Sequence, residues 1–171
     1  PLGNSTVGSL IKFNNKQYQV ESLESFCPKK GQFIIFSAGS SVAEKYARDF
    51  VALGSFVIDL SSNFRYEDDV PLIIPEINGE ILGGPLNPAL IANPNCSTAQ
   101  LLMALKPIHD QAKIQFLNIA TYQAVSGTGK AALEELHNQT YFKDLVSESP
   151  VYPKQIAFNV IPQCDIFLEN N

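Results

Sequence analysis

A strand–helix–strand pattern between residues 32 and 60 constrains the fold of this chain more than any other feature. Residues 32–37 form a short apolar run that ends near a glycine, as expected of a buried parallel strand. Residues 42–53 have helical spacing, with Ser41 as the expected cap and Gly54 as the expected stop. Residues 55–60 form a second buried run. The expected buried face of the helix consists of Val42, Tyr46, Phe50 and Leu53.

This pattern predicts a βαβ unit and therefore an α/β fold. In such folds ligands bind at the carboxyl ends of the parallel strands. Those ends are residues 37–41 and residues 59–65. We therefore expect both loops to face a cofactor or a substrate.

Composition and charge limit the possible functions. A chain of 171 residues, 45% hydrophobic and 17% charged, fits one globular domain or parts of two. A net charge of −5 without a Lys/Arg cluster argues against nucleic-acid binding, and no apolar run approaches the roughly 18 residues of a membrane span. The odd set of Cys27, Cys96 and Cys164 has no CxxC spacing, which favours a reducing, cytoplasmic location over disulfides. We expect no metal.

Cys96 lies at the expected start of a second helix. Asn93 and Pro94 indicate a turn, and residues 99–105 have helical periodicity with no breaker until Pro107. A thiol at a helix start lies beside unpaired backbone N–H groups and the positive end of the helix dipole, which stabilise a thiolate. A thiolate attacks carbonyl carbon. The alternative is a small residue buried in the core.

The second half of the chain has a different expected order of strands and helices. We expect a longer strand over 113–121, a helix over 130–138, a polar excursion over 147–155 and a strand over 156–168. Residues 114–120 have apolar side chains on both faces of the expected strand, so both faces need cover. A partner subunit could supply one cover, which predicts a dimer, or the chain's own helix could supply it.

Six segments in order along the chain resemble aspartate-semialdehyde dehydrogenase: residues 36–41, 59–65, 71–78, 94–98, 121–129 and 156–163. The resemblance implies a partial Rossmann-type dinucleotide-binding domain over residues 1–95. Part of an α+β catalytic and dimerisation domain would follow over residues 96–171. Both domains would be incomplete, because the family has a glycine-rich turn before Leu2 and further catalytic residues after Asn171.

The reaction implied by the resemblance is NADPH-dependent reductive dephosphorylation of L-aspartyl 4-phosphate to aspartate 4-semialdehyde, in lysine, threonine and methionine biosynthesis. Cys96 matches the nucleophile that forms a thioester, and Gln123 matches the glutamine that orients its carbonyl. Arg65 and Asn95 match residues that bind phosphate. The alternatives are a surface arginine paired with Glu67, Asp68 or Asp69, an Asn95 that only shapes the turn, and a Gln123 that only closes a strand.

The cofactor residues implied by the resemblance lie in three loops. These residues are Ser5, Thr6, Gly39, Ser40, Ser41, Ser126 and Gly127. Ser5 stands where the family usually has an arginine for the 2′-phosphate of NADP, so NADP is expected and NAD is not excluded.

Two other functions stay open. N-acetyl-glutamyl-phosphate reductase shares the cysteine chemistry, but usually has glycine before the nucleophile and an aromatic residue after it, where this chain has Asn95 and Ser97. A non-catalytic binding fragment is the other alternative, because the family's base and carboxylate anchor lie beyond Asn171. The implied partners are a small-molecule substrate, phosphate and a second subunit, as a homodimer or homotetramer.

Overall fold

A computed structural model describes residues 1–83, 89–142 and 151–163. The chain divides into two compact units, Pro1–Gln115 and Phe116–Asn171, which are described separately below. The boundary between the two units lies after the helix that begins at Cys96, which was expected to be the first helix of the second domain. The domain boundary expected between residues 95 and 96 stays a prediction.

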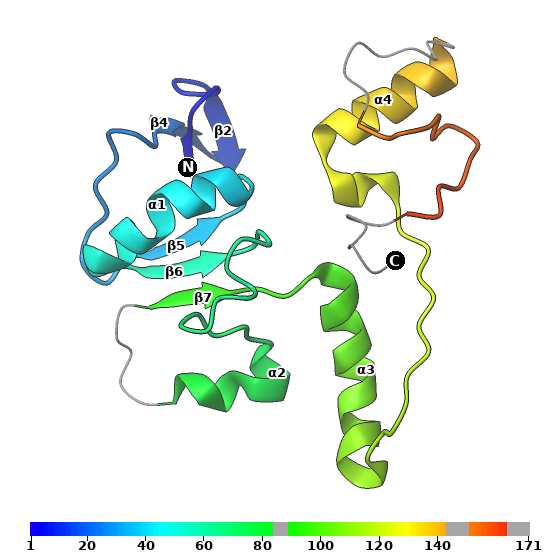
Figure 1. Ribbon diagram of the computed structural model, residues 1–171. Helices are drawn as coiled ribbons and strands as arrows, with labels where there is room; N and C mark the ends of the chain where they lie inside the picture. The colour runs from blue at the N-terminus through cyan, green and yellow to red at the C-terminus, as the bar shows by residue number, and fades with distance from the viewer. Residues whose placement is uncertain (84–88, 143–150, 164–171) are drawn as a thin grey trace. The chain divides into compact units, whose positions relative to one another are not determined.

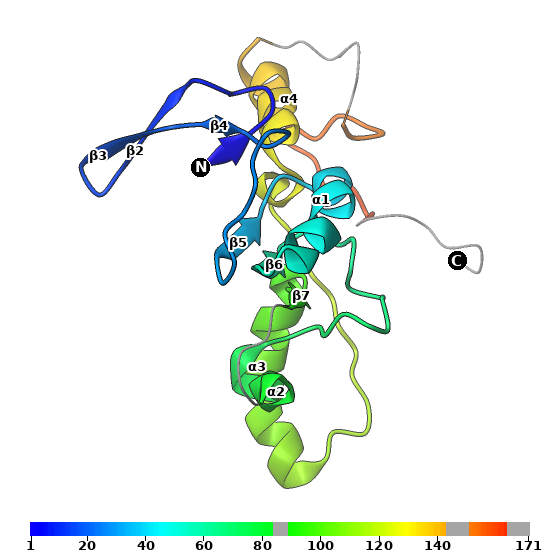
Figure 2. The same cartoon turned by 90° about the vertical axis from the view of Figure 1, so that its left-hand side faces the viewer.

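The first unit contains the predicted βαβ unit (Figure 1). Three parallel strands, β5 (Phe33–Phe36), β6 (Phe56–Asp59) and β7 (Leu90–Ala92), form a sheet in that order. The register pairs Ile35 with Ile58 and Ile58 with Ile91. Helix α1 (Ser40–Ala52) contacts all three strands and lies across one face of the sheet (Figures 1 and 2). The α/β fold and both predicted strands are confirmed.

The core lies between α1 and this sheet. Helix α1 buries Ala43, Ala47 and Phe50, while Val42 and Tyr46 are partly buried against the core. Leu53 is 51% exposed, so the expected buried face is wrong at its last position. The reason is that α1 ends at Ala52, and Gly54 turns the chain away with a φ of 93°.

Phe50 anchors this core. Its ring lies 5.8 Å from that of Phe36 and 5.9 Å from that of Phe26, centroid to centroid. We expect Phe50→Ala to lower the free energy of unfolding by roughly 3–5 kcal/mol, because a large buried ring is replaced by a cavity. Leu53→Ala, at the half-exposed residue that directly follows this helix, should cost about 1 kcal/mol or less. Urea denaturation measures both, and equal losses would contradict the packing.

Helix α3 (Cys96–Ala112) begins where the sequence places it, but it does not break at Pro107. It continues to Lys113, which has a φ of 52° and donates its N–H to the His109 carbonyl at 2.8 Å. Proline removes one helical N–H, and the residues on either side of it keep helical geometry. The helix therefore extends a further turn beyond its expected end.

Short elements complete the first unit. β1 (Leu2–Gly3) pairs in parallel with β4 (Glu21–Ser22), and β2 (Leu10–Phe13) forms a hairpin with β3 (Lys16–Gln19). A single turn of helix α2 (Pro75–Asn78) leads into the 3₁₀ turn η1 (Gly79–Leu82). Across the described residues, no helix has both the length and the apolar character needed to cross a membrane.

The second unit has the 3₁₀ turn η2 (Val125–Thr128) and helix α4 (Lys130–Tyr141). The predicted helix is confirmed, but the predicted strands are wrong in their described parts, because neither residues 113–121 nor residues 156–163 form a strand. A strand needs a neighbour to pair its backbone, and the described part of this unit offers none. Phe116 is 82% exposed, so the described part of this chain does not cover it, and the cover expected from a partner subunit stays a prediction.

Two expectations lie partly outside the described residues. The polar excursion over 147–155 is described only from residue 151, and the strand over 156–168 only to residue 163.

Candidate functional site

The loop after β5 leads directly into helix α1. Gly39 caps this helix with a φ of 91°, a left-handed conformation that strains any residue with a side chain. Ser41 was expected to be the cap, which is wrong, because α1 begins at Ser40 and no side chain caps it. The backbone N–H groups of the first turn, including those of Ser40 and Ser41, therefore have no capping side chain. A helix start of this kind binds phosphate.

The loop after β6 lies beside this helix start. The hydroxyls of Ser40 and Ser62 are 3.3 Å apart and share a hydrogen bond. The two loops predicted at the carboxyl ends of the strands are thus joined, as the βαβ pattern requires.

Asp59 organises the beginning of this second loop. Its side chain is fully buried and accepts hydrogen bonds from the Ser61 N–H at 3.0 Å and the Ser61 hydroxyl at 2.7 Å. The Ser61 hydroxyl oxygen in turn accepts the N–H of Asn63 at 3.2 Å. These bonds close a tight turn immediately after the strand.

Arg65 ends the loop and binds two backbone carbonyls. Its Nε donates to the carbonyl of Asn93 at 2.9 Å, and its Nη2 lies 3.4 Å from the carbonyl of Leu60. The N–H of Asn93 donates to the carbonyl of Asp59 at 2.9 Å. Both backbone groups of Asn93 therefore tie the end of β7 to the loop after β6. The arginine is thereby fixed against Asn93, which stands three residues before Cys96.

Arg65 has no carboxylate partner among the described residues. Instead, Arg48 binds Asp69 at 2.6 Å and lies 3.8 Å from Glu67. The hydrogen bonds from Arg48 hold the pKa of Asp69 below its usual value. Arg48 and Arg65 are the only arginines in the sequence. Arg48 is neutralised by acidic side chains at the surface, and the guanidinium of Arg65 remains available to bind an anion. The alternative of a surface ion pair for Arg65 is thus not found.

Cys96 occupies the first position of helix α3, which Asn95 caps. The Oδ1 of Asn95 accepts the N–H of Ser97 at 2.9 Å and also the Ser97 hydroxyl. The Cys96 sulfur lies 3.9 Å from the same oxygen. The thiol is free and exposed, so it is not the buried core residue of the alternative interpretation. It lies at the first position of a 17-residue helix, at the positive end of the helix dipole.

Three candidate residues lie in the second unit. Gln123 is exposed and accepts a hydrogen bond from the Thr121 hydroxyl at 3.3 Å. Ser126 and Gly127 are exposed in η2, and their contact with a cofactor stays a prediction. The hydroxyl of Thr128, the last residue of η2, lies 2.7 Å from that of Tyr152, so the turn is anchored to a segment 24 residues away in the sequence.

Ser5 and Thr6 lie in the exposed turn between β1 and β2. The Thr6 carbonyl accepts both the N–H and the hydroxyl of Ser9, at 3.1 and 2.7 Å. No hydrogen bond in the described chain joins this turn to the residues from Gly39 to Ser41. The structure therefore brings together the loops after β5, β6 and β7, but not this turn.

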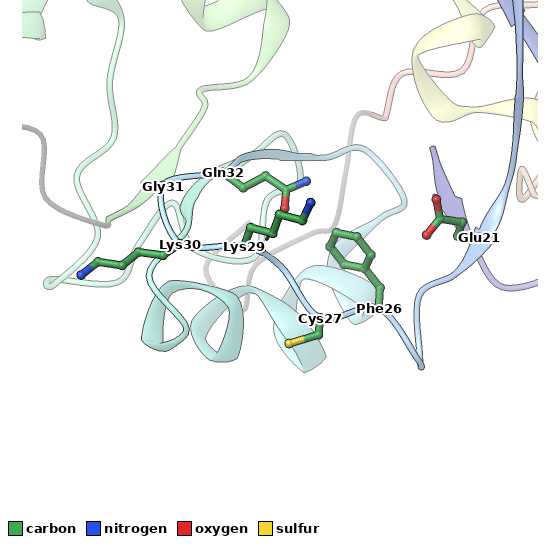
Figure 3. Close-up of a pocket in the computed structure, with 7 residues that line it drawn as sticks. All are labelled: Glu21, Phe26, Cys27, Lys29, Lys30, Gly31 and Gln32. Carbon is green, nitrogen blue, oxygen red and sulfur yellow. Dashed lines mark hydrogen bonds between the residues drawn. The ribbon is translucent and has the colours of Figure 1, made fainter.

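A hollow of about 530 Å³ lies at the opposite, amino end of β5 (Figure 3). Lys30 extends away from Lys29 and Gln32 there, so the polar side chains do not converge on one point. Within the described part of the chain, no group of three His, Cys, Asp or Glu residues could hold a metal ion. The strand ends, rather than this hollow, form the candidate site.

Sequence reasoning missed Asp59 and Asn93. The Asp-x-Ser spacing at a strand end is a turn signal that could have identified Asp59. Nothing in the sequence signals Asn93, because it acts through its backbone N–H and carbonyl.

Comparison with known proteins agrees with this architecture. The family model described as semialdehyde dehydrogenase, NAD binding domain, matches residues 2–84, and the model for its dimerisation domain matches residues 105–171. The chain therefore belongs to the semialdehyde dehydrogenase family.

Within this family the similar proteins are aspartate-semialdehyde dehydrogenases. The enzyme of Shewanella violacea is 50% identical over 99% of this chain and 51% of its own length. The second such enzyme of Vibrio cholerae is 44% identical over 95% of the chain and 49% of its own length. A crystal structure of aspartate semialdehyde dehydrogenase II from Vibrio cholerae matches 99% of this chain and 51% of its own with a TM-score of 0.88 at 42% identity. The chain spans about half the length of the curated relatives it matches.

Proposed function

We propose that this chain forms part of an aspartate-semialdehyde dehydrogenase, which converts L-aspartyl 4-phosphate into aspartate 4-semialdehyde and phosphate. The observation that carries the proposal is an exposed helix-start thiol, Cys96, that follows by three residues the backbone carbonyl bound by Arg65, an arginine without an ion-pair partner among the described residues. Relatives with that name at 50% and 44% identity support it.

In this proposal Cys96 attacks the acyl carbon of the substrate as a thiolate. The bond from carbon to the phosphate oxygen breaks, phosphate leaves, and a thioester remains on the sulfur. Hydride then adds to the thioester carbon, the carbon–sulfur bond breaks, and the aldehyde leaves with the thiolate restored.

Arg65 and Asn95 are proposed to hold the phosphate. Two nitrogens of Arg65 already bind backbone carbonyls, which fixes the plane of the guanidinium and leaves Nη1 for an anion. The Oδ1 of Asn95 accepts the hydrogen bonds of the helix cap, and its Nδ2, the donor of the side chain, is proposed to bind a phosphate oxygen. Gln123 is proposed to orient the thioester carbonyl through its amide, on the strength of the family resemblance.

The described residues fit a dinucleotide cofactor at the start of α1. A Cβ built on Gly39 meets nothing within 4 Å, and no side chain caps the helix, so a phosphate could approach the backbone closely. When bound, a nicotinamide dinucleotide would supply the hydride. Ser40, Ser41, Ser126 and Gly127 are proposed to bind it. NADP is proposed over NAD with Ser5 and Thr6 near its 2′-phosphate, as hydrogen-bonding residues without a charge.

Assembly and location belong to the same proposal. The match to a dimerisation domain over residues 105–171 supports a homodimer, and a homotetramer built from two dimers would use the same interface. A cytoplasmic location is proposed from the biosynthetic reaction and from the odd number of cysteines.

A substrate comparison tests the function against N-acetyl-glutamyl-phosphate reductase. A complete enzyme containing this chain should oxidise aspartate 4-semialdehyde in the presence of phosphate. Its kcat/KM for N-acetyl-glutamate semialdehyde should be at least about 10²-fold lower, because the two substrates differ in length and in the charge of the amino group. Initial rates with both aldehydes decide the question. Activity with the acetylated aldehyde alone would overturn the proposal.

A further inference from the structure

We propose that Asp59 is a positioning residue for Arg65, so that a buried carboxylate at the end of β6 fixes the orientation of the phosphate-binding guanidinium. The inference deepens the proposed function and rests on it. It is carried by hydrogen bonds that link Asp59 to Arg65 along two routes.

The burial of Asp59 needs an explanation. Its relative exposure is 0%, and no lysine or arginine among the described residues forms an ion pair with it. A buried carboxylate without a cation destabilises a fold unless hydrogen bonds satisfy it, and an apolar residue of similar size would avoid that cost. Its donors are the N–H and hydroxyl of Ser61, within its own loop. The carboxylate thus shapes the loop rather than the core.

The first route runs through the loop itself. Asp59 holds Ser61, and the Ser61 hydroxyl oxygen accepts the N–H of Asn63, two residues before Arg65. The Nη2 of Arg65 then reaches back to the carbonyl of Leu60, beside Asp59 in the chain. The loop is closed at both ends, so its shape determines where the guanidinium lies.

The second route crosses to the end of β7. This route uses the backbone carbonyl of Asp59, whose position depends on the turn that the carboxylate closes. That carbonyl accepts the N–H of Asn93, and the carbonyl of Asn93 accepts the Nε–H of Arg65. Asn93 stands three residues before Cys96, so this clamp relates the arginine to the start of helix α3. A change in the loop at Asp59 would move Arg65 relative to the nucleophile without touching either residue.

The test follows the Nε–H resonance of Arg65 in the 171-residue chain by ¹H–¹⁵N NMR. The sequence has two arginines, so Arg48→Lys removes one of two Nε–H signals and assigns the other. In Asp59→Asn we expect the solvent exchange of the Arg65 signal to accelerate by about tenfold or more, because its hydrogen bond to Asn93 weakens.

Two further variants keep the test decisive. Ser61→Ala removes the hydroxyl's bonds to Asp59 and Asn63 and keeps both the buried charge and the bond from the Ser61 N–H. It should accelerate exchange even if Asp59→Asn does not fold. Ser55→Ala is the matched control, because Ser55 is a buried serine next to the opposite end of β6 whose hydroxyl has no hydrogen-bond partner among the described residues. In Ser55→Ala, the solvent exchange of the Arg65 Nε–H signal should match that of the unmodified chain. A folded Asp59→Asn or Ser61→Ala protein with unchanged Arg65 exchange would overturn the inference.

Kinetics separate this inference from the proposed function. In a complete enzyme, Asp59→Asn should raise the KM for phosphate by about tenfold while the rate of Cys96 alkylation by iodoacetamide stays unchanged. An active enzyme in which the KM for phosphate does not change would overturn the positioning role alone. An unmodified enzyme without activity on the aldehyde would overturn the proposed function, while the NMR result would still decide whether Asp59 orients Arg65.

Discussion

Replacing Cys96 by serine in a complete enzyme containing this chain is expected to lower kcat/KM on the order of 10⁴-fold. Serine keeps the size of the side chain but replaces a thiol by a hydroxyl, which is a much weaker nucleophile. The position at the start of helix α3 cannot make up for the weaker nucleophilicity of the hydroxyl. Phosphate-dependent oxidation of aspartate 4-semialdehyde, followed through the reduced nicotinamide, measures the loss.

Cys27→Ser is the control for this substitution. Cys27 is also free and exposed, but it lines the hollow at the amino end of β5, away from the strand ends that form the site. We expect its kcat/KM to remain within about twofold of the unmodified enzyme, as for surface substitutions generally. Comparable losses in both variants would show that oxidation or misfolding, and not nucleophilic attack, accounts for the effect at Cys96.

Replacing Arg65 by alanine is expected to raise the KM for phosphate by about 10²-fold. A charge-assisted hydrogen bond contributes roughly 1.5–3 kcal/mol, and the guanidinium can offer two such bonds to phosphate. Arg65→Lys should restore only part of the affinity, because an ammonium group cannot bind Asn93, Leu60 and an anion in one plane. Initial rates over a range of phosphate concentrations measure both variants.

Arg48→Ala provides the matched control. It removes the other arginine of the chain, whose partners Asp69 and Glu67 are exposed, and surface pairs of this kind contribute little to stability. Its KM for phosphate should therefore stay unchanged. If both arginine variants shifted the KM equally, general electrostatic attraction would explain phosphate binding, and the assignment of Arg65 would be wrong.

The sequence predicts the βαβ unit well because its strands are short, apolar and separated by a helix with a glycine stop. Periodicity alone places β5, α1 and β6 and therefore identifies the two loops at their carboxyl ends. The buried face of the helix was predicted less accurately at its end. The helix ends at Ala52, one residue earlier than expected, and the side chain of Leu53 therefore turns toward solvent. The helix start at Cys96 was predictable because Asn95 and Pro94 are specific signals.

Features that depend on distant partners were not predictable. Residues 113–121 have the composition of a strand, but a strand exists only when another strand pairs with it. The clamp on Arg65 uses the backbone of Asn93, 28 residues away, and backbone groups carry no residue signature. The pairing of Arg48 with Asp69 depends in the same way on how α1 packs.

The most direct test of a cysteine nucleophile at this strand end is a map of the covalent adduct. The complete enzyme is incubated with aspartate 4-semialdehyde and oxidised NADP in the absence of phosphate, quenched in acid, digested and analysed by mass spectrometry. We predict an aspartyl thioester on the peptide that contains Cys96, which disappears when phosphate is added before the quench. An adduct on Cys27, or steady turnover with no adduct at Cys96, would contradict the account.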